Sequence, residues 1–300
     1  MATSTQQKML RIGHSPDPDD AFMWYALADF VAPDGMRLRP KIDTGDYCFV
    51  HVLEDIQSLN DRSECAELEI TALSIHQYPF VAQQYALTSC GSSMGDNYGP
   101  MVVAPQSFAM SQIKGRHIAI PGLRTTAWLA MQILLAEHGL SPDDVACSVV
   151  PFDQIIDRVA DGQFDAGLII HEGQLTYARA GLECVVDLGQ WWTQSRGLPL
   201  PLGGNAIRRD LAGQMPAICG VLLDSIRFAL ANRDEAVRFA LQYARNIGPD
   251  LADRFVGMYV NKWTLDYGLQ GRQAVLRLVQ EGIAANILPD CGEIDFVTPS

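Results

Sequence analysis

The sequence predicts an α/β protein of two lobes, with one domain inserted between the halves of another. Short apolar runs alternate with segments of helical spacing, which is typical of sheets built from parallel strands and covered by helices. Two extended passages, at residues 100–103 and 200–204, bracket a block of ordinary domain size. We therefore expect a larger discontinuous domain of residues 1–101 and 206–300, a smaller inserted domain of residues 102–205, and a ligand cleft between them.

The composition limits the classes of molecule that the protein is expected to bind. The chain has 300 residues, of which 48% are hydrophobic and 19% charged, as expected for a globular protein with a substantial core. Its 35 acidic and 22 basic residues give a net charge of −13, which argues against a nucleic-acid partner. A small anionic ligand remains compatible with this charge, because the N-terminus of one helix can bind an anion locally.

The N-terminal sequence and the cysteines indicate the cellular compartment of the protein. Residues 1–8 lack the apolar core of a secretory signal, and no apolar run looks long enough to span a membrane. The seven cysteines are odd in number and none forms a C-x-x-C pair, which favours free thiols over disulfides or a zinc site. We expect a cytoplasmic protein without membrane contact, and the sequence leaves a homodimer open.

The elements of the first hundred residues follow from periodicity. Short apolar runs mark strands, and apolar residues that recur every three or four positions mark helices. Pro16 and Pro18 prevent a helix before Pro18, and the neighbouring aspartates can cap the helix that follows. The expected strands are residues 10–13, 36–42 and 68–73, and the expected helices are residues 22–30, 50–59 and 75–84.

The same signals continue through the rest of the chain. Gly139 ends an amphipathic helix, and residues 198–204 form an extended return segment. Residues 211–285 have an almost wholly helical period. The expected strands are residues 100–104, 116–120, 147–150, 166–170 and 184–188, and the expected helices between them include residues 127–138 and 174–180.

His171 is the first candidate for chemistry. It stands where the apolar run of residues 166–170 ends, followed by Glu172 and Gly173. Ligands of open α/β sheets bind outside the carboxyl ends of the strands, and a histidine can take up or release a proton near neutral pH. A purely structural role at the strand end explains the position about equally well.

Two further positions suggest anion binding. Thr125 and Thr126 precede a strong helix and follow Arg124, so hydroxyls, helix N–H groups and a guanidinium could together hold a carboxylate or phosphate. An ordinary helix cap with a solvent-facing arginine is the alternative, although capping accounts for only one threonine. Ser74 repeats the arrangement after another strand, where an N-cap is the simpler account of that residue alone.

The remaining polar and aromatic motifs carry less weight. Ser15, Asp17, Asp19 and Asp20 follow the first strand, but their spacing is not that of a calcium loop, which favours a capped turn with solvated carboxylates. Trp191–Trp192 could stack an aromatic ligand, and core packing is the default interpretation.

Several common catalytic motifs are missing from the sequence. The segment at residues 171–174 lacks the second histidine of a zincin, and the chain has no P-loop, no dinucleotide-binding glycine fingerprint and no G-x-S-x-G motif. The residues therefore indicate a two-lobed anion-binding cleft with one histidine placed as a base. They do not specify the substrate.

Five motifs together carry a family resemblance. They are SPDPDDAFMWYAL at residues 15–27, RTTA at 124–127, GLIIHE at 167–172, VDLGQWW at 186–192 and GLPLPLG at 197–203. They resemble the 1,4-dihydroxy-6-naphthoate synthases of the futalosine route to menaquinone, and the resemblance covers most of the chain. It implies a type II periplasmic-binding-protein fold and a carbon–carbon lyase that converts cyclic de-hypoxanthine futalosine to 1,4-dihydroxy-6-naphthoate and a three-carbon fragment, without a metal or redox cofactor.

The resemblance also assigns roles to residues. It places the proton acceptor of the family at His171 and the substrate-contacting threonines at Thr125 and Thr126. It places further substrate contacts at Ala72, Leu73 and Ser74. Apart from the resemblance, we also expect Arg124 and Ser15 to contact the substrate. The first loop departs from the family, because many members read Ser-Pro-Cys-Pro-Asn-Asp-Thr where this chain has Asp17, Asp19 and Ala21. This departure indicates a changed role for the loop or an altered substrate.

Three other functions share the expected fold. A solute-binding protein for a small anion is the strongest rival from another class, and the free cysteines and N-terminal sequence speak against it. Chorismate dehydratase is a sister enzyme, but the His-Glu, Trp-Trp and Leu-Pro-Leu-Pro-Leu segments favour the naphthoate synthase. A ligand-binding module of a regulator is the third, and no helix-turn-helix segment accompanies it.

Overall fold

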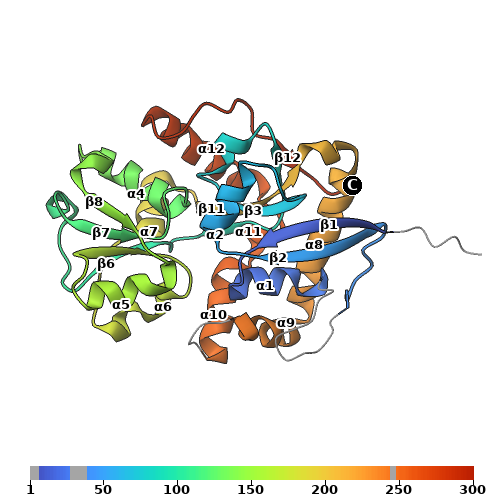
Figure 1. The fold of residues 1–300 in the computed structure, drawn as a ribbon, viewed down its shortest axis with the longest axis horizontal. Coiled ribbons are helices and arrows are strands. Elements are labelled where there is room, and N and C mark those ends of the chain that lie inside the picture. The colour runs from blue at the N-terminus through green and yellow to red at the C-terminus, as the bar shows by residue number, and fades with distance from the viewer. Residues whose placement is uncertain (1–6, 28–38, 244–247) are drawn as a thin grey trace, which may run out of the picture.

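Two mixed β-sheets organise the chain, one in each lobe (Figure 1). The structure is a computed structural model that describes residues 7–27, 39–243 and 248–300. The N-terminal part and the C-terminal helices build the lobe on the right of Figure 1, and the middle of the chain builds the lobe on the left.

The larger sheet has the order β12-β4-β11-β3-β1-β2, and β5 pairs with β11 beside this path. β1 is parallel to β2 and β3, whereas β11 is antiparallel to β3, β4 and β5. Its strands are β1 (Lys8–His14), β2 (Tyr47–Leu53), β3 (Ile70–Ser74), β4 (Tyr85–Thr88), β5 (Ser93–Gly95), β11 (Leu200–Arg208) and β12 (Phe296–Val297).

The smaller sheet has the order β10-β6-β9-β7-β8. β7 is parallel to β8 and β9, and β6 is antiparallel to β9 and β10. Its strands are β6 (Met101–Ala104), β7 (His117–Ile120), β8 (Ala146–Val149), β9 (Ala166–Ile169) and β10 (Glu183–Asp187). The expectation of parallel sheets is therefore wrong in part, because β6 and β11, the strands beside the two crossovers, run against their neighbours. β11 also begins at Leu200, ahead of the domain boundary expected at residue 206.

Helices cover both sheets, and most of them belong to the larger lobe. They are α1 (Pro18–Trp24), α2 (Ile56–Ser63), α3 (Tyr78–Val81), α4 (Thr126–Glu137), α5 (Ile155–Ala160), α6 (Gly173–Thr176), α7 (Leu188–Arg196), α8 (Met215–Ala231), α9 (Arg233–Ala240), α10 (Pro249–Tyr259), α11 (Lys262–Leu265) and α12 (Gly268–Ala284). Short 3₁₀ turns extend several of them, including Tyr25–Leu27 after α1 and Tyr177–Ala180 after α6.

Two of the expected helices are wrong. Residues 50–59 form the end of β2 and the start of α2, because residues 47–53 pair with β1 over its whole length and bury Tyr47 and Phe49. Residues 75–84 contain only the single turn of α3, and the chain then enters β4, whose four residues are all buried.

Two further expected elements lie partly outside the described residues. Within the expected strand at residues 36–42, residues 36–38 lie outside the described residues and 39–42 form no strand. The expected helix at residues 22–30 begins earlier, at Pro18, and its residues 28–30 are also outside the described part.

The core of the larger lobe is built around α8. The segment Arg209–Ala231 is long and apolar enough to cross a membrane by length and composition, so the expectation that no run approaches that length is wrong. Ile218, Leu222 and Ile226 of α8 are fully buried in a cluster shared with α1. Burial in this core accounts for the apolar character of the segment.

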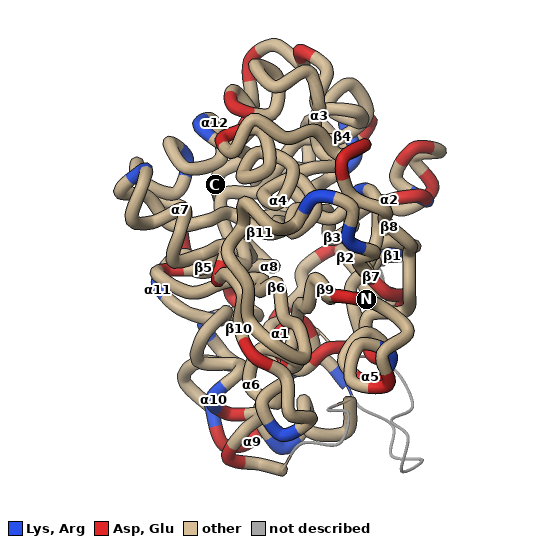
Figure 2. The backbone as a smooth tube through the Cα atoms, turned by 90° about the vertical axis from the view of Figure 1, so that its left-hand side faces the viewer, with Lys and Arg blue, Asp and Glu red and all other residues tan. Residues whose placement is uncertain are grey.

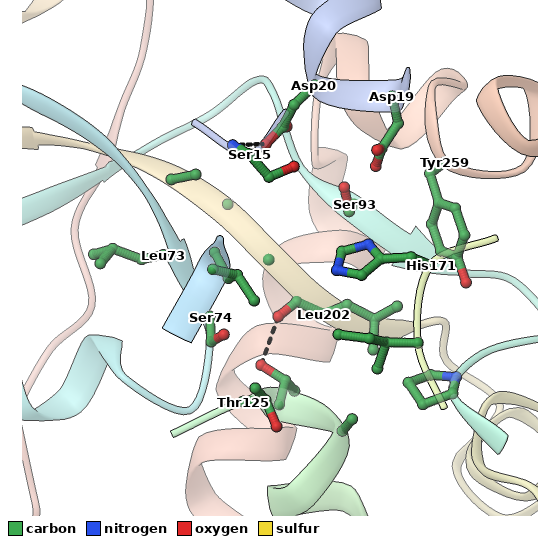
Figure 3. A pocket seen from close by; sticks show the side chains of 18 of the residues that line it. Ser15, Asp19, Asp20, Leu73, Ser74, Ser93, Thr125, His171, Leu202 and Tyr259 are labelled. Atoms are coloured by element: carbon green, nitrogen blue, oxygen red, sulfur yellow. Dashed lines mark hydrogen bonds between the residues drawn. The ribbon is translucent and has the colours of Figure 1, made fainter. Parts of the chain in front are cut away.

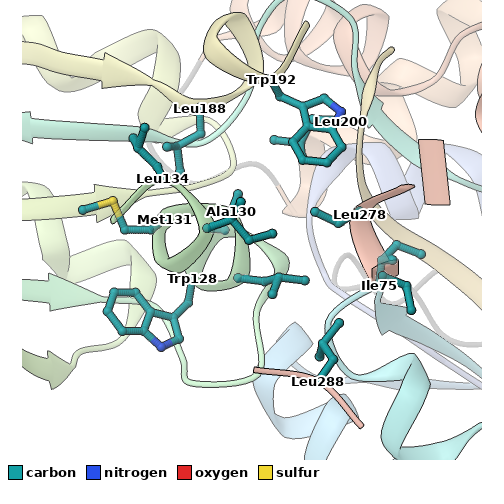
Figure 4. Close-up of a cluster of buried hydrophobic side chains, with 14 of the residues drawn as sticks. Ile75, Trp128, Ala130, Met131, Leu134, Leu188, Trp192, Leu200, Leu278 and Leu288 are labelled. Carbon is teal, nitrogen blue, oxygen red and sulfur yellow. The ribbon is translucent and has the colours of Figure 1, made fainter. Parts of the chain in front are cut away.

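A second apolar cluster joins the two lobes (Figure 4). Met131 and Leu134 of α4 belong to it from the smaller lobe, and Ile75, Leu278 and Leu288 belong to it from the larger lobe. The lobes therefore share a continuous core on one side of the cleft. Seen from the smaller lobe, acidic and basic positions are interspersed along the described chain, without a continuous basic band (Figure 2).

Candidate active site

A cavity lies between the two lobes and takes residues from both (Figure 3). The larger lobe contributes Ser15 after β1, Ala72–Ser74 at the end of β3, and Gly203 on β11. The smaller lobe contributes Thr125 and Thr126 at the start of α4, and His171 after β9. Side chains that follow different strands converge here because each segment leaves its sheet at the edge that faces the other lobe.

His171 projects toward the middle of this cavity (Figure 3). Its backbone has a φ of 55°, in the left-handed region that residues other than glycine seldom adopt. The ring packs against Phe152, with 4.6 Å between the ring centroids. Within the described residues, the buried Nε2 atom has no hydrogen-bond partner. The geometry leaves this nitrogen available to a ligand.

Asp17 lies behind the ring of His171. Its Oδ2 atom is 3.3 Å from His171 Nδ1, and its side chain is 1% exposed. Asp19 and Asp20 are buried as well, so the expected solvated turn is wrong. The turn follows β1 at the face between the lobes, where the smaller lobe covers it, and this tertiary burial has no local signal.

The buried carboxyls perturb one another. Burial raises the pKa of Asp19 to about 8, with further increases from the neighbouring Asp20 and Asp17 carboxyls. Burial also raises the pKa of Asp20 to about 7, partly offset by the backbone N–H of Ser15, which donates to Asp20 Oδ2 at 2.8 Å. Burial therefore favours the protonated form of these carboxyls within the cavity.

Asn60 of α2 fixes Ser74. The Ser74 backbone N–H donates to Asn60 Oδ1 at 3.0 Å, and Asn60 Nδ2 donates to Ser74 Oγ at 3.0 Å. These two bonds leave the Ser74 hydroxyl hydrogen free to donate to a ligand, since a serine has one donor and two acceptor sites. The geometry is compatible with the expected contact role of Ser74.

Thr125 acts as the N-cap of α4. Its hydroxyl donates to the Gly122 carbonyl at 2.9 Å and accepts from the Trp128 backbone N–H at 3.3 Å. Because the hydroxyl hydrogen is already used, Thr125 can offer a ligand only a remaining lone pair. The cap role that the sequence left open is thus present, and the residue lines the cavity as well.

Thr126 connects the lobes. Its hydroxyl donates to the Leu202 carbonyl and accepts from the His76 backbone N–H at 3.2 Å. His76 Nδ1 lies 3.0 Å from the Thr125 carbonyl, and burial lowers the pKa of His76 to about 4, which keeps it neutral. Donors for an anion would therefore come from the first-turn N–H groups of α4 rather than from the two hydroxyls.

Arg124 does not line the cavity. Its guanidinium stacks over the ring of Phe80 at 3.7 Å from the centroid, and its backbone carbonyl accepts from Asn60 Nδ2 at 3.3 Å. The geometry does not bring the guanidinium to the predicted anion site. Trp192 is fully buried and Trp191 packs beside it, away from the cavity-lining residues, so the pair serves core packing.

Sequence reasoning missed several polar residues that line the cavity. Gln174 follows His171 by one helical turn, and its Oε1 atom accepts from the Tyr259 hydroxyl at 2.8 Å. Asn205 donates through Nδ2 to the Gly91 carbonyl at 2.7 Å, while its Oδ1 atom has no partner among the described residues. Tyr259 and Asn205 arrive from distant parts of the chain, and no local pattern marks them. The described residues hold no group of three potential metal ligands.

Comparisons with known proteins identify relatives over nearly the whole chain. The sequence matches the menaquinone biosynthesis family over residues 10–283. It is 37% identical over 279 residues to the 1,4-dihydroxy-6-naphthoate synthase of Thermus thermophilus, covering 93% of this chain and 95% of that protein. It is 33% identical over 285 residues to the enzyme of the same name from Streptomyces coelicolor, covering 94% and 96%.

Solved structures agree with the predicted fold. A crystal structure of a protein from Archaeoglobus fulgidus has a TM-score of 0.81 at 40% identity, covering 93% of this chain and 98% of that one. The alkanesulfonate-binding protein SsuA from Xanthomonas axonopodis pv. citri has a TM-score of 0.70 at 14% identity, covering 97% and 98%, which shows a shared fold alone. The periplasmic-binding-protein-like fold is thereby confirmed, and this chain belongs to the menaquinone biosynthesis family.

Proposed function

We propose that the protein is a carbon–carbon lyase that converts cyclic de-hypoxanthine futalosine to 1,4-dihydroxy-6-naphthoate, with release of a three-carbon fragment, in menaquinone biosynthesis. The observation that carries this proposal is the Nε2 atom of His171, which has no hydrogen-bond partner among the described residues and points into the cavity between the lobes, in a chain of this family. A histidine with an unbonded ring nitrogen in a ligand cavity is suited to act as a general base.

The proposed reaction begins with proton removal. His171 Nε2 takes a proton from the cyclic substrate, and a carbon–carbon bond then breaks in a retro-aldol manner. The electron pair of the broken bond enters the ring system, which becomes aromatic and thereby favours the forward reaction. Burial raises the pKa of Asp19 and so favours its protonated form, which can donate a proton to a developing negative charge.

Substrate binding divides between the lobes. The first-turn N–H groups of α4 would hold the substrate carboxylate, since the hydroxyls of Thr125 and Thr126 already donate within the protein. Ser74 would donate to a hydroxyl or carbonyl from the larger lobe, while Ala72, Leu73 and Ser15 would supply the wall. Enclosure between two lobes excludes water and orients the reacting groups.

The proposal places the reaction in the cytoplasm. All seven cysteines are free, including the buried pair Cys90 and Cys219, whose sulfur atoms lie 3.9 Å apart. Unpaired thiols at this separation fit a reducing compartment.

Incubation of the purified protein with cyclic de-hypoxanthine futalosine tests the proposal, with the naphthoate product measured by mass spectrometry. The wild type should form product, and His171→Ala should lose about 10²- to 10⁴-fold in turnover. His138→Ala is the matched control, because His138 is an exposed residue at the end of α4. A wild type that binds the substrate without forming product would overturn the lyase and indicate a binding protein.

A further inference from the structure

The contact between Asp17 and His171 crosses the cleft. Asp17 precedes α1 in the larger lobe, and His171 follows β9 in the smaller lobe. The 3.3 Å between Asp17 Oδ2 and His171 Nδ1 is an ion-pair distance, on the side of the ring opposite the free Nε2 atom. The pair therefore exists only when the lobes lie against each other as they do in this structure.

The side chain of Asp17 does not serve its own helix. Asp17 occupies the N-cap position of α1, with a φ of −82° and a ψ of 156°, yet its carboxylate makes no cap hydrogen bond. An aspartate at this position ordinarily accepts from the second or third N–H of the helix. The carboxyl is 1% exposed and is directed to His171 instead, at an ion-pair distance.

We propose that Asp17 is a positioning residue that holds His171 in the tautomer with its proton on Nδ1, so that the Nε2 lone pair faces the substrate. The kinetic consequence rests on the lyase function proposed above. A carboxylate behind a histidine fixes which ring nitrogen carries the proton and stabilises the imidazolium that forms after proton uptake. Contacts of this kind are often long without substrate and shorten once it binds.

Kinetics of Asp17→Asn test the role. The amide keeps the shape of the side chain but carries no charge for the imidazolium. We expect kcat to fall about 10²-fold while KM changes little, because substrate binding does not use Asp17. Asp187→Asn is the matched control, since Asp187 is also a buried N-cap but accepts from Gly189 and Gln190 of its own helix. An active wild type whose Asp17→Asn variant keeps full kcat would overturn the proposal.

The tautomer can be measured without any activity. Nitrogen-15 NMR of the histidine side chains, assigned by comparison with His171→Ala, should show the neutral His171 ring of the wild type with its proton on Nδ1. Asp17→Ala should shift the population toward the Nε2–H form. A wild-type His171 protonated on Nε2 would overturn the positioning role, whereas absence of product from the wild type would overturn only the lyase function.

Discussion

Asn60 holds Ser74 with both ends of its side-chain amide, and the same amide reaches the backbone of the other lobe. Asn60 Oδ1 accepts from the Ser74 N–H, and Nδ2 donates to both Ser74 Oγ and the Arg124 carbonyl. Asn60 is fully buried, so water cannot replace these partners. One side chain therefore fixes a cavity-lining residue and connects the larger lobe to the loop that precedes α4.

Asn60→Ala should lower the free energy of unfolding by about 1–3 kcal/mol, because it leaves the buried N–H of Ser74 without its acceptor. Urea denaturation followed by circular dichroism measures the change. Asn232→Ala is the control, since Asn232 is exposed and its amide donates to the Phe228 carbonyl four residues earlier. We expect a loss of less than about 0.5 kcal/mol there. Equal losses in the two variants would contradict the structural role of Asn60.

The left-handed backbone of His171 makes a second prediction. At a φ of 55° an alanine keeps the steric strain that glycine avoids. His171→Gly should therefore be about 1 kcal/mol more stable than His171→Ala, although neither variant has a base. Thermal denaturation of the two proteins in the same buffer measures the difference. A glycine variant that is less stable than the alanine variant would show that this backbone conformation is unstrained.

Asp19 makes stability depend on pH. Burial raises its folded-state pKa to about 8, above the ordinary value of 3.8. The folded protein then binds more protons than the unfolded chain, so the stabilisation is lost as pH rises toward about 8. The expected slope is at most about 1.4 kcal/mol per pH unit for this one group. Unfolding free energies at about pH 6.5 and 8.5 should differ, with the lower value at the higher pH.

Asp19→Asn should reduce this dependence, because the amide does not titrate, while Asp20, whose pKa burial raises to about 7, retains part of it. The comparison avoids lower pH, where burial also lowers the pKa of His14 to about 3 and that of His76 to about 4. Below about pH 6.5, His14 and His76 bind protons in the unfolded chain but not in the folded protein. Their contribution to stability therefore falls as pH decreases. An Asp19→Asn slope equal to that of the wild type would assign the effect to other groups.

The parts of the site that follow from local pattern were predictable. The apolar runs that became β3 and β9 locate Ser74 and His171, since a short buried strand and the polar residue after it are adjacent in sequence. Helical spacing likewise locates α4 and the threonines that begin it. The apolar residues Val50, Leu53 and Ile56 also repeat every three positions, but pairing with β1 makes residues 50–53 the end of a strand. Tertiary pairing with β1, rather than the local pattern, determined the secondary structure there.

The contact between Asp17 and His171 could not be predicted from the sequence, for a related reason. A proline-framed turn with three aspartates has the same local pattern whether water or another lobe covers it. The two residues meet only through the packing of two domains, and no periodicity encodes which segments face each other across a cleft. Arg124 is the reverse case, because its charge suggested an anion ligand while Phe80 offers the guanidinium a stacking surface.

An ion pair joins the lobes beside the shared core. Arg196 of α7 stacks over Trp191 and Trp192 and donates through Nη2 to Glu281 of α12 at 2.6 Å, with side chains 8% and 17% exposed. Arg196→Met keeps an apolar stem but removes the charge, and it should cost about 2 kcal/mol in urea unfolding monitored by tryptophan fluorescence.

A surface pair supplies the control for this prediction. Arg227 and Asp224 pair at 3.3 Å with side chains 62% and 59% exposed, so Arg227→Met should cost less than about 0.5 kcal/mol. Solvent screens the exposed Arg227–Asp224 pair more than the largely buried Arg196–Glu281 pair. Equal losses in the two variants would therefore contradict a stabilising role for the Arg196–Glu281 pair. The greater loss at Arg196 would show that this contact between α7 and α12 contributes to the stability of the folded protein.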